Sequence, residues 1–193
     1  IHGFDPLTPL EETLRALDDL VTSGKVRYIG ASNYAAWQLA HSNDVALAAG
    51  WNQFVSVQPH YHMLERGIEQ ELVPCCETFE VGILPYFPLA GGFLTGKYSR
   101  DEKPQESRYA NRDSSHEQQL FSEPAFQVLD VVRELAEEKG CTPGQLSLAW
   151  VKEQPAVTAP IIGPRTMEQL EDNLGAADVE ITDEDRQRLD QVA

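Results

Sequence analysis

Basic residues are scarce in this chain. Its 193 residues include 15 Lys and Arg against 31 Asp and Glu, so the formal net charge at pH 7 is −16. A surface this acidic repels the phosphates of nucleic acids and of anionic membranes, and we expect neither as a partner. Binding of a single phosphate group in a local basic pocket is still compatible with this charge.

Long apolar runs and cysteines are scarce as well. No apolar run approaches the roughly 18 residues of a membrane span, and no signal peptide is visible. The three cysteines, Cys75, Cys76 and Cys141, are few and odd in number, which favours reduced thiols in a cytoplasmic protein over a disulfide framework. The chain begins at Ile1-His2 without a methionine, and from this we expect a cut or processed N-terminus.

The sequence does contain an alternation of strand-like and helical segments. Hydrophobic residues make up 41 % of it, enough for a packed core. The apolar patterns predict strands at 26–31, 54–58, 81–86 and 157–163, with the tail of a fifth at 1–2. They predict helices at about 10–24, 34–49, 68–80, 126–139 and 143–154, and two more from 166 and from 182. The long Gly- and Ser-containing segment at about 91–124 is predicted to be a loop over a cofactor or substrate.

Capping signals fix the starts of two of these helices. Thr8 with Glu11, and Thr142 with Gln145, have the spacing of a capping box, and each pair is followed by a helical apolar pattern. Such boxes predict that the threonine hydroxyl accepts a hydrogen bond from the backbone three residues later.

Two α/β architectures fit this alternation, an open doubly wound sheet and a (β/α)8 barrel. No Gly-x-Gly-x-x-Gly follows a predicted strand, which weakens the first. A barrel usually needs about 250 residues, so this chain would supply just over half of one. In either fold the active groups lie at the carboxyl ends of the strands. The predicted strands end in polar or aromatic residues: His2, Ser32, Asn33, Gln58, Tyr86 and 163–165.

Four motifs carry a resemblance to a known family. They are HGFD (2–5), GKVRYIGASN (24–33), PLAGGFLTGKY (88–98) and IGPRTMEQLEDN (162–173). In this order and spacing they resemble the aldo-keto reductase superfamily, most of all its bacterial and potassium-channel β-subunit-like branch. The resemblance implies a (β/α)8 TIM barrel of which this chain supplies about strands four to eight, as one partial domain over 1–193. It also implies NADP-dependent reduction of a small aldehyde or ketone by hydride transfer.

The resemblance gives roles to the residues at the nicotinamide end of the cofactor. His2 matches the family's catalytic histidine, beside the carbonyl oxygen on which negative charge develops. Ser32, Asn33 and Gln58 match the partners of the nicotinamide carboxamide, and Tyr86 matches the ring that stacks on the nicotinamide. Taken without the resemblance, Ser32 and Asn33 are equally typical of turn and cap chemistry, and Tyr86 of core packing. His2 would be a strand-end histidine bonded to a backbone carbonyl, and Gln58 a routine polar strand end.

It also gives roles at the phosphate and adenosine end. The backbone of Phe87, Pro88, Leu89 and Ala90 matches contacts along the pyrophosphate, and Lys97 and Arg108 match charges nearby. The adenosine end is matched by Gly163, Arg165, Gln169, Asp172 and Asn173. The planar guanidinium of Arg165 can pair with a 2′-phosphate, which favours NADP (NADPH) over NAD. Read alone, residues 163–166 would be an ordinary turn followed by a helix cap.

The sequence departs from the family at the acid–base cluster. The family's tyrosine, lysine and aspartate precede the histidine, and no residue here matches them. We therefore expect a missing N-terminal half-barrel, from the same gene product or another chain, and a chain that is incomplete for catalysis. A cofactor-binding regulatory subunit on the same barrel, or a catalytically inactive truncated barrel, is the alternative.

Three further features of the sequence give weaker signals. His60 and His62 could place two imidazoles on one strand face, but no motif supplies a third ligand, so no metal is expected. The adjacent Cys75 and Cys76 are predicted to pack in a core or groove. The acidic stretch at 178–190 is predicted to be a solvated helix face.

Overall fold

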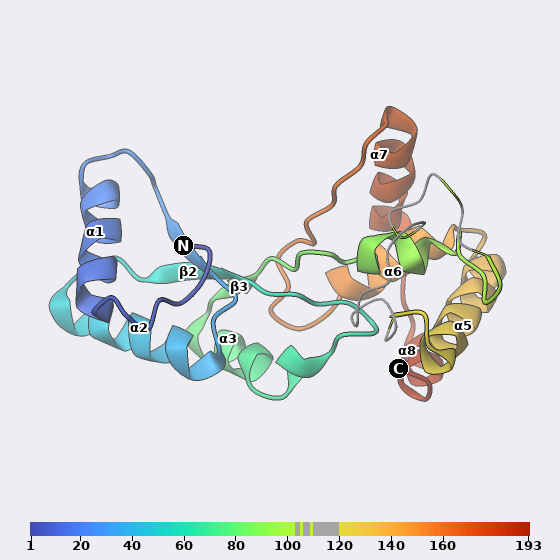
Figure 1. Ribbon diagram of the computed structural model, residues 1–193, viewed down its shortest axis with the longest axis horizontal. Helices are drawn as coiled ribbons and strands as arrows, with labels where there is room; N and C mark the ends of the chain where they lie inside the picture. The colour runs from blue at the N-terminus through green and yellow to red at the C-terminus, as the bar shows by residue number, and fades with distance from the viewer. Residues whose placement is uncertain (103–104, 106–108, 110–119) are drawn as a thin grey trace. The chain divides into compact units, whose positions relative to one another are not determined.

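The computed structural model describes residues 1–102, 105, 109 and 120–193 (Figure 1). The predicted cofactor residue Arg108 and part of the predicted loop at 91–124 lie outside these residues. The contacts divide the chain into two compact units. Unit 1 comprises Ile1–His60, Gly67–Tyr86 and Pro155–Ala159, and unit 2 comprises Tyr61–Arg66, Phe87–Gln154 and Pro160–Ala193.

Unit 1 is built on a parallel sheet. Within the described residues the sheet has three strands, β1 (Ile29–Ser32), β2 (Phe54–Gln58) and β3 (Gly82–Ile83), in the order β1-β2-β3. The predicted strand at 54–58 is confirmed in full, and the strands predicted at 26–31 and 81–86 are shorter than expected. The register places Ser32 opposite Gln58, so two of the predicted site residues end neighbouring strands side by side.

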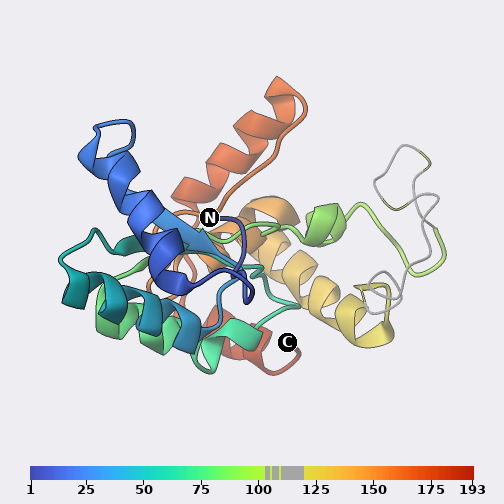
Figure 2. The ribbon, with the colours of Figure 1, turned by 60° about the vertical axis from the view of Figure 1, so that its left-hand side comes forward.

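Helices pack on this sheet because their apolar faces need a partner. They are α1 (Leu10–Thr22), α2 (Ala36–Ala49) and α3 (Leu72–Phe79), with the short 3-10 helix η1 at Gly67–Glu69. Figure 2 shows α2 and α3 side by side, in agreement with their contacts to each other and to β2 and β3. The buried core of the unit includes Leu14, Leu39, Phe54, Val57 and Ile83, which come from α1, α2 and the strands.

The predicted strand at 157–163 was wrong. Only a bridge forms there, between Val157 and Ile83, with one hydrogen bond from Ile83 N to Ala156 O (2.8 Å) and another from Thr158 N to Ile83 O (2.9 Å). Pro160 has no N–H to continue the ladder, and prolines are excluded from paired strand interiors for that reason.

The capping box predicted at Thr8 was wrong too. The Thr8 hydroxyl donates instead to Asp5 Oδ2 (2.6 Å), and α1 begins at Leu10 with Pro9 as its N-cap. Because Pro9 and not Thr8 holds the N-cap position, the Thr8 hydroxyl lies one residue too early to cap α1.

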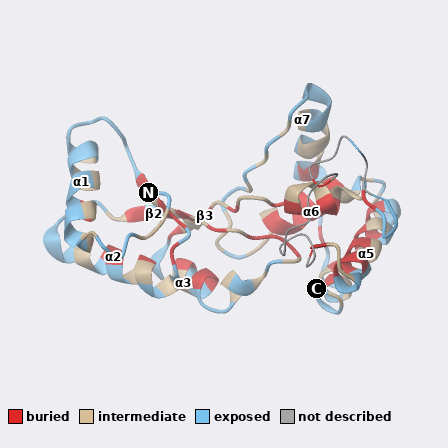
Figure 3. Cartoon of the chain, viewed as in Figure 1, coloured by how far each residue is buried: buried red, intermediate tan, exposed pale blue. Residues whose placement is uncertain are grey.

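Unit 2 is helical. It contains the 3-10 helix η2 (Ala90–Thr95), α5 (Glu123–Lys139), α6 (Pro143–Lys152), α7 (Met167–Leu174), η3 (Gly175–Asp178) and α8 (Asp183–Asp190). Figure 3 shows α6 as largely buried, and it contacts α5, η2, η3 and α7. The capping box of Thr142 and Gln145 is confirmed, and Thr166 and Thr182 cap α7 and α8.

The acidic stretch at 178–190 is not wholly solvated. Asp185 is 7 % exposed and forms an ion pair of 2.7 Å with Lys139 of α5. Its carboxylate also accepts from the backbone and hydroxyl of Thr182. The carboxylate of Asp185, at the third position of α8, therefore caps this helix and links it to α5. The sequence pattern did not distinguish Asp185 from the other acidic residues of 178–190.

The cysteines of this chain were expected to be reduced, and no membrane-spanning segment was expected. Cys75, Cys76 and Cys141 are free thiols, and Cys76 belongs to the core of unit 1, as predicted. Burial first, and the neighbouring Cys75 second, raise the pKa of Cys76 to about 12. Of the helices in the described residues, none combines the length and apolarity that crossing a membrane requires.

Candidate functional site

The carboxyl ends of the parallel strands in unit 1 bring four of the predicted residues together. Ser32 ends β1, Gln58 ends β2, and Tyr86 follows β3. Asn33 comes directly after β1, and its N–H donates to Gln58 O (3.2 Å). Strand ends of a parallel sheet meet at one edge, which is where active groups collect in α/β folds.

Asn33 is the centre of this edge. Its Nδ2 donates to His2 O (3.1 Å) and to Ser32 Oγ (3.2 Å), and its Oδ1 accepts from the Tyr86 hydroxyl (3.0 Å). Ser32 in turn donates to Gln58 O (2.8 Å). The backbone of Asn33 is left-handed, with φ of 55°, a conformation that asparagine tolerates better than most residues. The amide of Asn33 thus links three segments that lie far apart in the sequence.

Tyr86 is held on two sides. Its hydroxyl bonds Asn33, and its ring stacks on the imidazole of His60, with the two ring centroids 5.2 Å apart and the planes 7° from parallel. Tyr86 is half-buried rather than part of the core. One face of its ring is therefore committed to His60, and the sequence alone gave no signal of this pairing.

The histidines are used for packing and turn formation. His60 stacks on Tyr86, and Nδ1 of His62, which is 3 % exposed, accepts from Leu64 N (3.1 Å). No group of three or more His, Cys, Asp or Glu able to hold a metal ion occurs among the described residues. His2, the predicted catalytic residue, is exposed, and the structure ties its carbonyl to Asn33.

A strained turn in unit 2 follows Tyr86. Phe87 has φ of 65° and Ala90 has φ of 49°, and Gly91 and Gly92 continue with φ of 65° and 97°. A positive φ is costly for a phenylalanine or an alanine, by about 1–2 kcal/mol each. Strain of this kind clusters at ligand sites, and the backbone contacts predicted for residues 87–90 stay a prediction.

Lys97 lies against this turn. Its ammonium is 5.2 Å from the ring centroid of Tyr98, and a Cβ on Gly92 would come within 2.7 Å of Nζ, so a side chain there would displace the ammonium. Lys97 is exposed as a residue, but its charged end is partly desolvated. That desolvation, and secondly the positive charge of Arg165, lower the pKa of Lys97.

Lys97 and Arg165 are two neighbouring cations without a carboxylate between them. In the part of the chain that the structure describes, neither forms an ion pair. The charge of Arg165 raises the cost of the charge on Lys97, and an anion placed near both would relieve that repulsion. The chemistry of the pair suits a phosphate group.

The predicted adenosine residues start and flank α7. The N–H of Arg165 donates to Gln169 Oε1 (2.8 Å), and Gln169 N donates to Thr166 Oγ1 (3.2 Å), which closes the helix start. Asp172 instead contacts α6, where its carboxylate accepts from Thr142 Oγ1 (3.2 Å) and its carbonyl accepts from Gln145 Nε2 (2.8 Å). Gly163 is exposed and Asn173 is half-buried.

Comparison with known proteins agrees with these motifs. Residues 1–193 match the aldo/keto reductase family. The chain is 34 % identical over 197 residues to the versiconal hemiacetal acetate reductase of Aspergillus parasiticus, covering 99 % of this chain and 55 % of that protein. It is 35 % identical over 191 residues to a putative aryl-alcohol dehydrogenase of Schizosaccharomyces pombe, covering 99 % and 53 %. It is 36 % identical over 184 residues to the uncharacterized oxidoreductase YrpG of Bacillus subtilis, covering 95 % and 54 %. The chain spans about half the length of these curated relatives.

Proposed function

Because the chain belongs to the aldo/keto reductase family, we propose that its protein is an NADPH-dependent oxidoreductase that reduces aldehydes or ketones. The family implies a (β/α)8 barrel, and the parallel sheet and helices of this chain are consistent with it. The observation that carries the proposal is the amide of Asn33, bonded to Ser32, Tyr86 and the carbonyl of His2 at one sheet edge.

This network fits a nicotinamide carboxamide. A carboxamide has one acceptor oxygen and two N–H donors, the same set that the Asn33 side chain has. It can take over bonds that Asn33, Ser32 and Tyr86 now make with each other. When bound, the dihydronicotinamide supplies the hydride. The residues of this chain orient it: the amide and hydroxyls fix the carboxamide, and the ring of Tyr86, backed by His60, offers a face for stacking.

The second half of the fit concerns the phosphates. Lys97 and Arg165 are neighbouring cations that form no ion pair among the described residues, and Lys97 lies against the strained turn at 87–92. We propose that the backbone of Phe87, Pro88, Leu89 and Ala90 follows the pyrophosphate. Arg165, Gln169, Asp172 and Asn173, with Gly163, then hold the adenosine end. Arg165 takes the 2′-phosphate and so selects NADPH.

His2 is the one residue proposed to act on the carbonyl group itself. Its imidazole is exposed and can donate a hydrogen bond to the carbonyl oxygen as negative charge develops there. The order of the motifs supports assigning this chain to about strands four to eight of a barrel, within the bacterial and potassium-channel β-subunit-like branch. The family's tyrosine, lysine and aspartate then come from an N-terminal half-barrel, in the same gene product or another chain. We propose a cytoplasmic enzyme, in keeping with its free thiols.

The test uses the complete gene product. NADPH binding is measured by fluorescence titration, and turnover by NADPH consumption with a panel of aldehydes and ketones. The proposal requires both binding and turnover. Binding without turnover on any carbonyl would support a cofactor-binding regulatory subunit, and failure to bind would overturn both. Residues 1–193 expressed alone are expected to show no more than a small fraction of that turnover, because loss of an acid–base group costs about 10²–10⁴-fold.

A further inference from the structure

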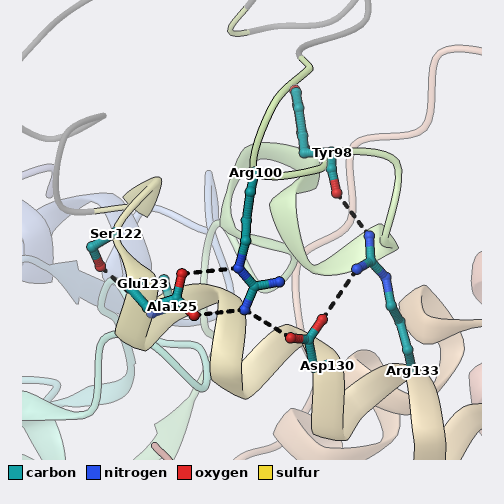
Figure 4. Close-up of polar contacts among 7 residues, drawn as sticks. All are labelled: Tyr98, Arg100, Ser122, Glu123, Ala125, Asp130 and Arg133. Atoms are coloured by element: carbon teal, nitrogen blue, oxygen red, sulfur yellow. Dashed lines mark hydrogen bonds and ion pairs between the residues drawn. The ribbon is translucent and has the colours of Figure 1, made fainter.

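Arg133 of α5 grips the backbone on both sides of Lys97. Its Nη2 donates to Gly96 O (2.8 Å) and to Tyr98 O (2.7 Å), the carbonyls of the residues before and after the lysine. Figure 4 shows the guanidinium reaching from the helix to the Tyr98 carbonyl. A single nitrogen with two hydrogens thus holds two backbone carbonyls that are two residues apart.

The guanidinium is itself held in place. Nη1 of Arg133 is bonded to Asp130 Oδ1 (3.3 Å), one turn earlier on α5. The other oxygen of Asp130 accepts from Arg100 (2.9 Å), and Arg100 forks onto both carboxylate oxygens of Glu123 (2.9 and 2.8 Å). Figure 4 shows this chain of charges running along one side of α5. Alternating charges at such distances restrict the rotamers of Arg133.

The segment that Arg133 grips has little freedom apart from the lysine side chain. Gly96 has φ of 81°, and a Cβ there would lie 3.2 Å from Pro143 at the start of α6. Tyr98 is fully buried, with no exposed surface. Lys97, between them, is exposed, and its ammonium lies over the Tyr98 ring. The direction of the lysine is therefore set by the two peptide groups that Arg133 holds.

We propose that Arg133 is a positioning residue, which holds the backbone of residues 96–98 so that the Lys97 ammonium stands where a cofactor phosphate binds. The guanidinium makes no contact with the ligand in this proposal and acts only through Lys97. The inference rests on the proposed function in one respect, namely that Lys97 contacts NADPH. The role needs arginine, because its planar fork serves Asp130 and two carbonyls at once, and a lysine cannot serve all three with the same geometry.

The experiment is a double-mutant cycle in the complete gene product. NADPH dissociation constants are measured for Arg133→Met, Lys97→Met and the double variant. We expect Arg133→Met to weaken binding about five- to tenfold. In the Lys97→Met background the same substitution should change the dissociation constant by less than about twofold, because its effect passes through the lysine. Arg133→Lys should restore part of the loss.

The matched control is Arg188→Met. Arg188 also pairs with α5, through Glu134 and Glu138, and its side chain bonds no other residue in the part of the chain that the structure describes. It should lower the melting temperature by an amount similar to Arg133→Met and leave the NADPH affinity unchanged.

A readout without cofactor separates this proposal from the proposed function. The titration of the Lys97 ammonium is followed by NMR, with Lys97→Met identifying its signal. In Arg133→Met the pKa of Lys97 should rise toward its ordinary value, because the ammonium leaves its desolvated place over Tyr98. An unchanged Lys97 titration, or affinity losses that multiply in the double variant, would overturn the positioning role while leaving the proposed function intact. An unchanged NADPH affinity in Lys97→Met would show that Lys97 does not contact a cofactor phosphate, and this result would overturn the positioning role of Arg133 as well.

Discussion

The hydroxyl of Tyr86 donates a hydrogen bond of 3.0 Å to Oδ1 of Asn33, a residue 53 positions earlier in the chain. This bond joins the segment after β3 to the residue after β1, at the edge of the sheet where the strands end. It couples the ring expected to stack on the nicotinamide to the amide expected to bind its carboxamide. Substitution of either residue should therefore remove a hydrogen bond that positions the other. The first two predictions follow from that coupling.

Asn33 should matter for cofactor binding more than for folding. We expect both Asn33→Gly and Asn33→Ala to weaken NADPH binding about tenfold, because each removes the amide that ties His2, Ser32 and Tyr86 together. Asn33→Ala should also lower the free energy of unfolding by about 1 kcal/mol relative to Asn33→Gly, since φ of 55° is strained for alanine. Fluorescence titration and urea unfolding measure the two effects.

The control for Asn33 is Asn52→Ala, which removes an asparagine amide that donates to Asp18. Asn52 lies just before the start of β2, at the opposite end of that strand from the candidate site. It should leave the NADPH affinity unchanged. Wild-type affinity in both Asn33 variants would show that the amide is only a turn-forming group.

Tyr86 separates the role of a hydroxyl from that of a ring. Tyr86→Phe loses only the bond to Asn33 and should weaken NADPH binding by about 0.5–1.5 kcal/mol. Tyr86→Ala also loses the stacking face and should cost about 1 kcal/mol more. Tyr28→Ala, at a tyrosine that is 75 % exposed in the same unit, is the control for removing a ring. If Tyr86→Ala lowers the melting temperature sharply and spares the affinity, its ring serves packing alone.

Arg165 should decide between the two nicotinamide cofactors. We expect Arg165→Ala to weaken NADPH binding by about 1–3 kcal/mol and to leave NADH binding nearly unchanged, because only NADPH has the 2′-phosphate. The same variant should raise the pKa of Lys97, since the charge of Arg165 is one of the two causes that lower it. Titrations with both cofactors check the first effect, with the exposed Arg27→Ala as control. Equal losses for NADPH and NADH would contradict the assignment of Arg165 to the 2′-phosphate.

Asp185 should make the stability of unit 2 depend on pH. Burial by itself raises its pKa, but the hydrogen bonds from Lys139 and Thr182 outweigh it, and the pKa of Asp185 is lowered in the folded protein. A lowered pKa stabilises the fold above the ordinary value of 3.8, and the gain is lost as the pH falls through the folded-state value. We expect Asp185→Asn to cost about 1–2 kcal/mol at pH 7 and progressively less below pH of about 4.

Urea unfolding at several pH values measures this effect. Asp183→Asn serves as the control, because Asp183 is an exposed carboxylate in the same first turn of α8. A difference between wild type and Asp185→Asn that stays constant from pH 7 to about pH 3 would show that the charge of Asp185 contributes nothing.

The sequence by itself determined the features that depend on neighbours in the chain. A strand at 54–58 and caps at Thr142, Thr166 and Thr182 are local choices, since apolar alternation and a hydroxyl at the N-cap act within a few residues. The motifs also indicated the family, because they preserve residue types in a fixed order. Two local predictions failed: α1 begins one residue later than a cap at Thr8 requires, with Pro9 as its N-cap, and the segment after Val157 could not extend its ladder through Pro160.

Only the tertiary structure decided which distant groups meet. The bonds of Asn33 to His2 and Tyr86, the stacking of His60 on Tyr86, the closeness of Lys97 to Arg165 and the hold of Arg133 on residues 96 and 98 all join segments that the sequence leaves far apart. The sequence contains no indication of the role of Arg133, because the residue pattern of a helix is the same whether a surface arginine faces water or two backbone carbonyls. What separates these cases is the path of the backbone that comes to lie beside it, and that path is set by the packing of η2 and α6 around the buried Tyr98.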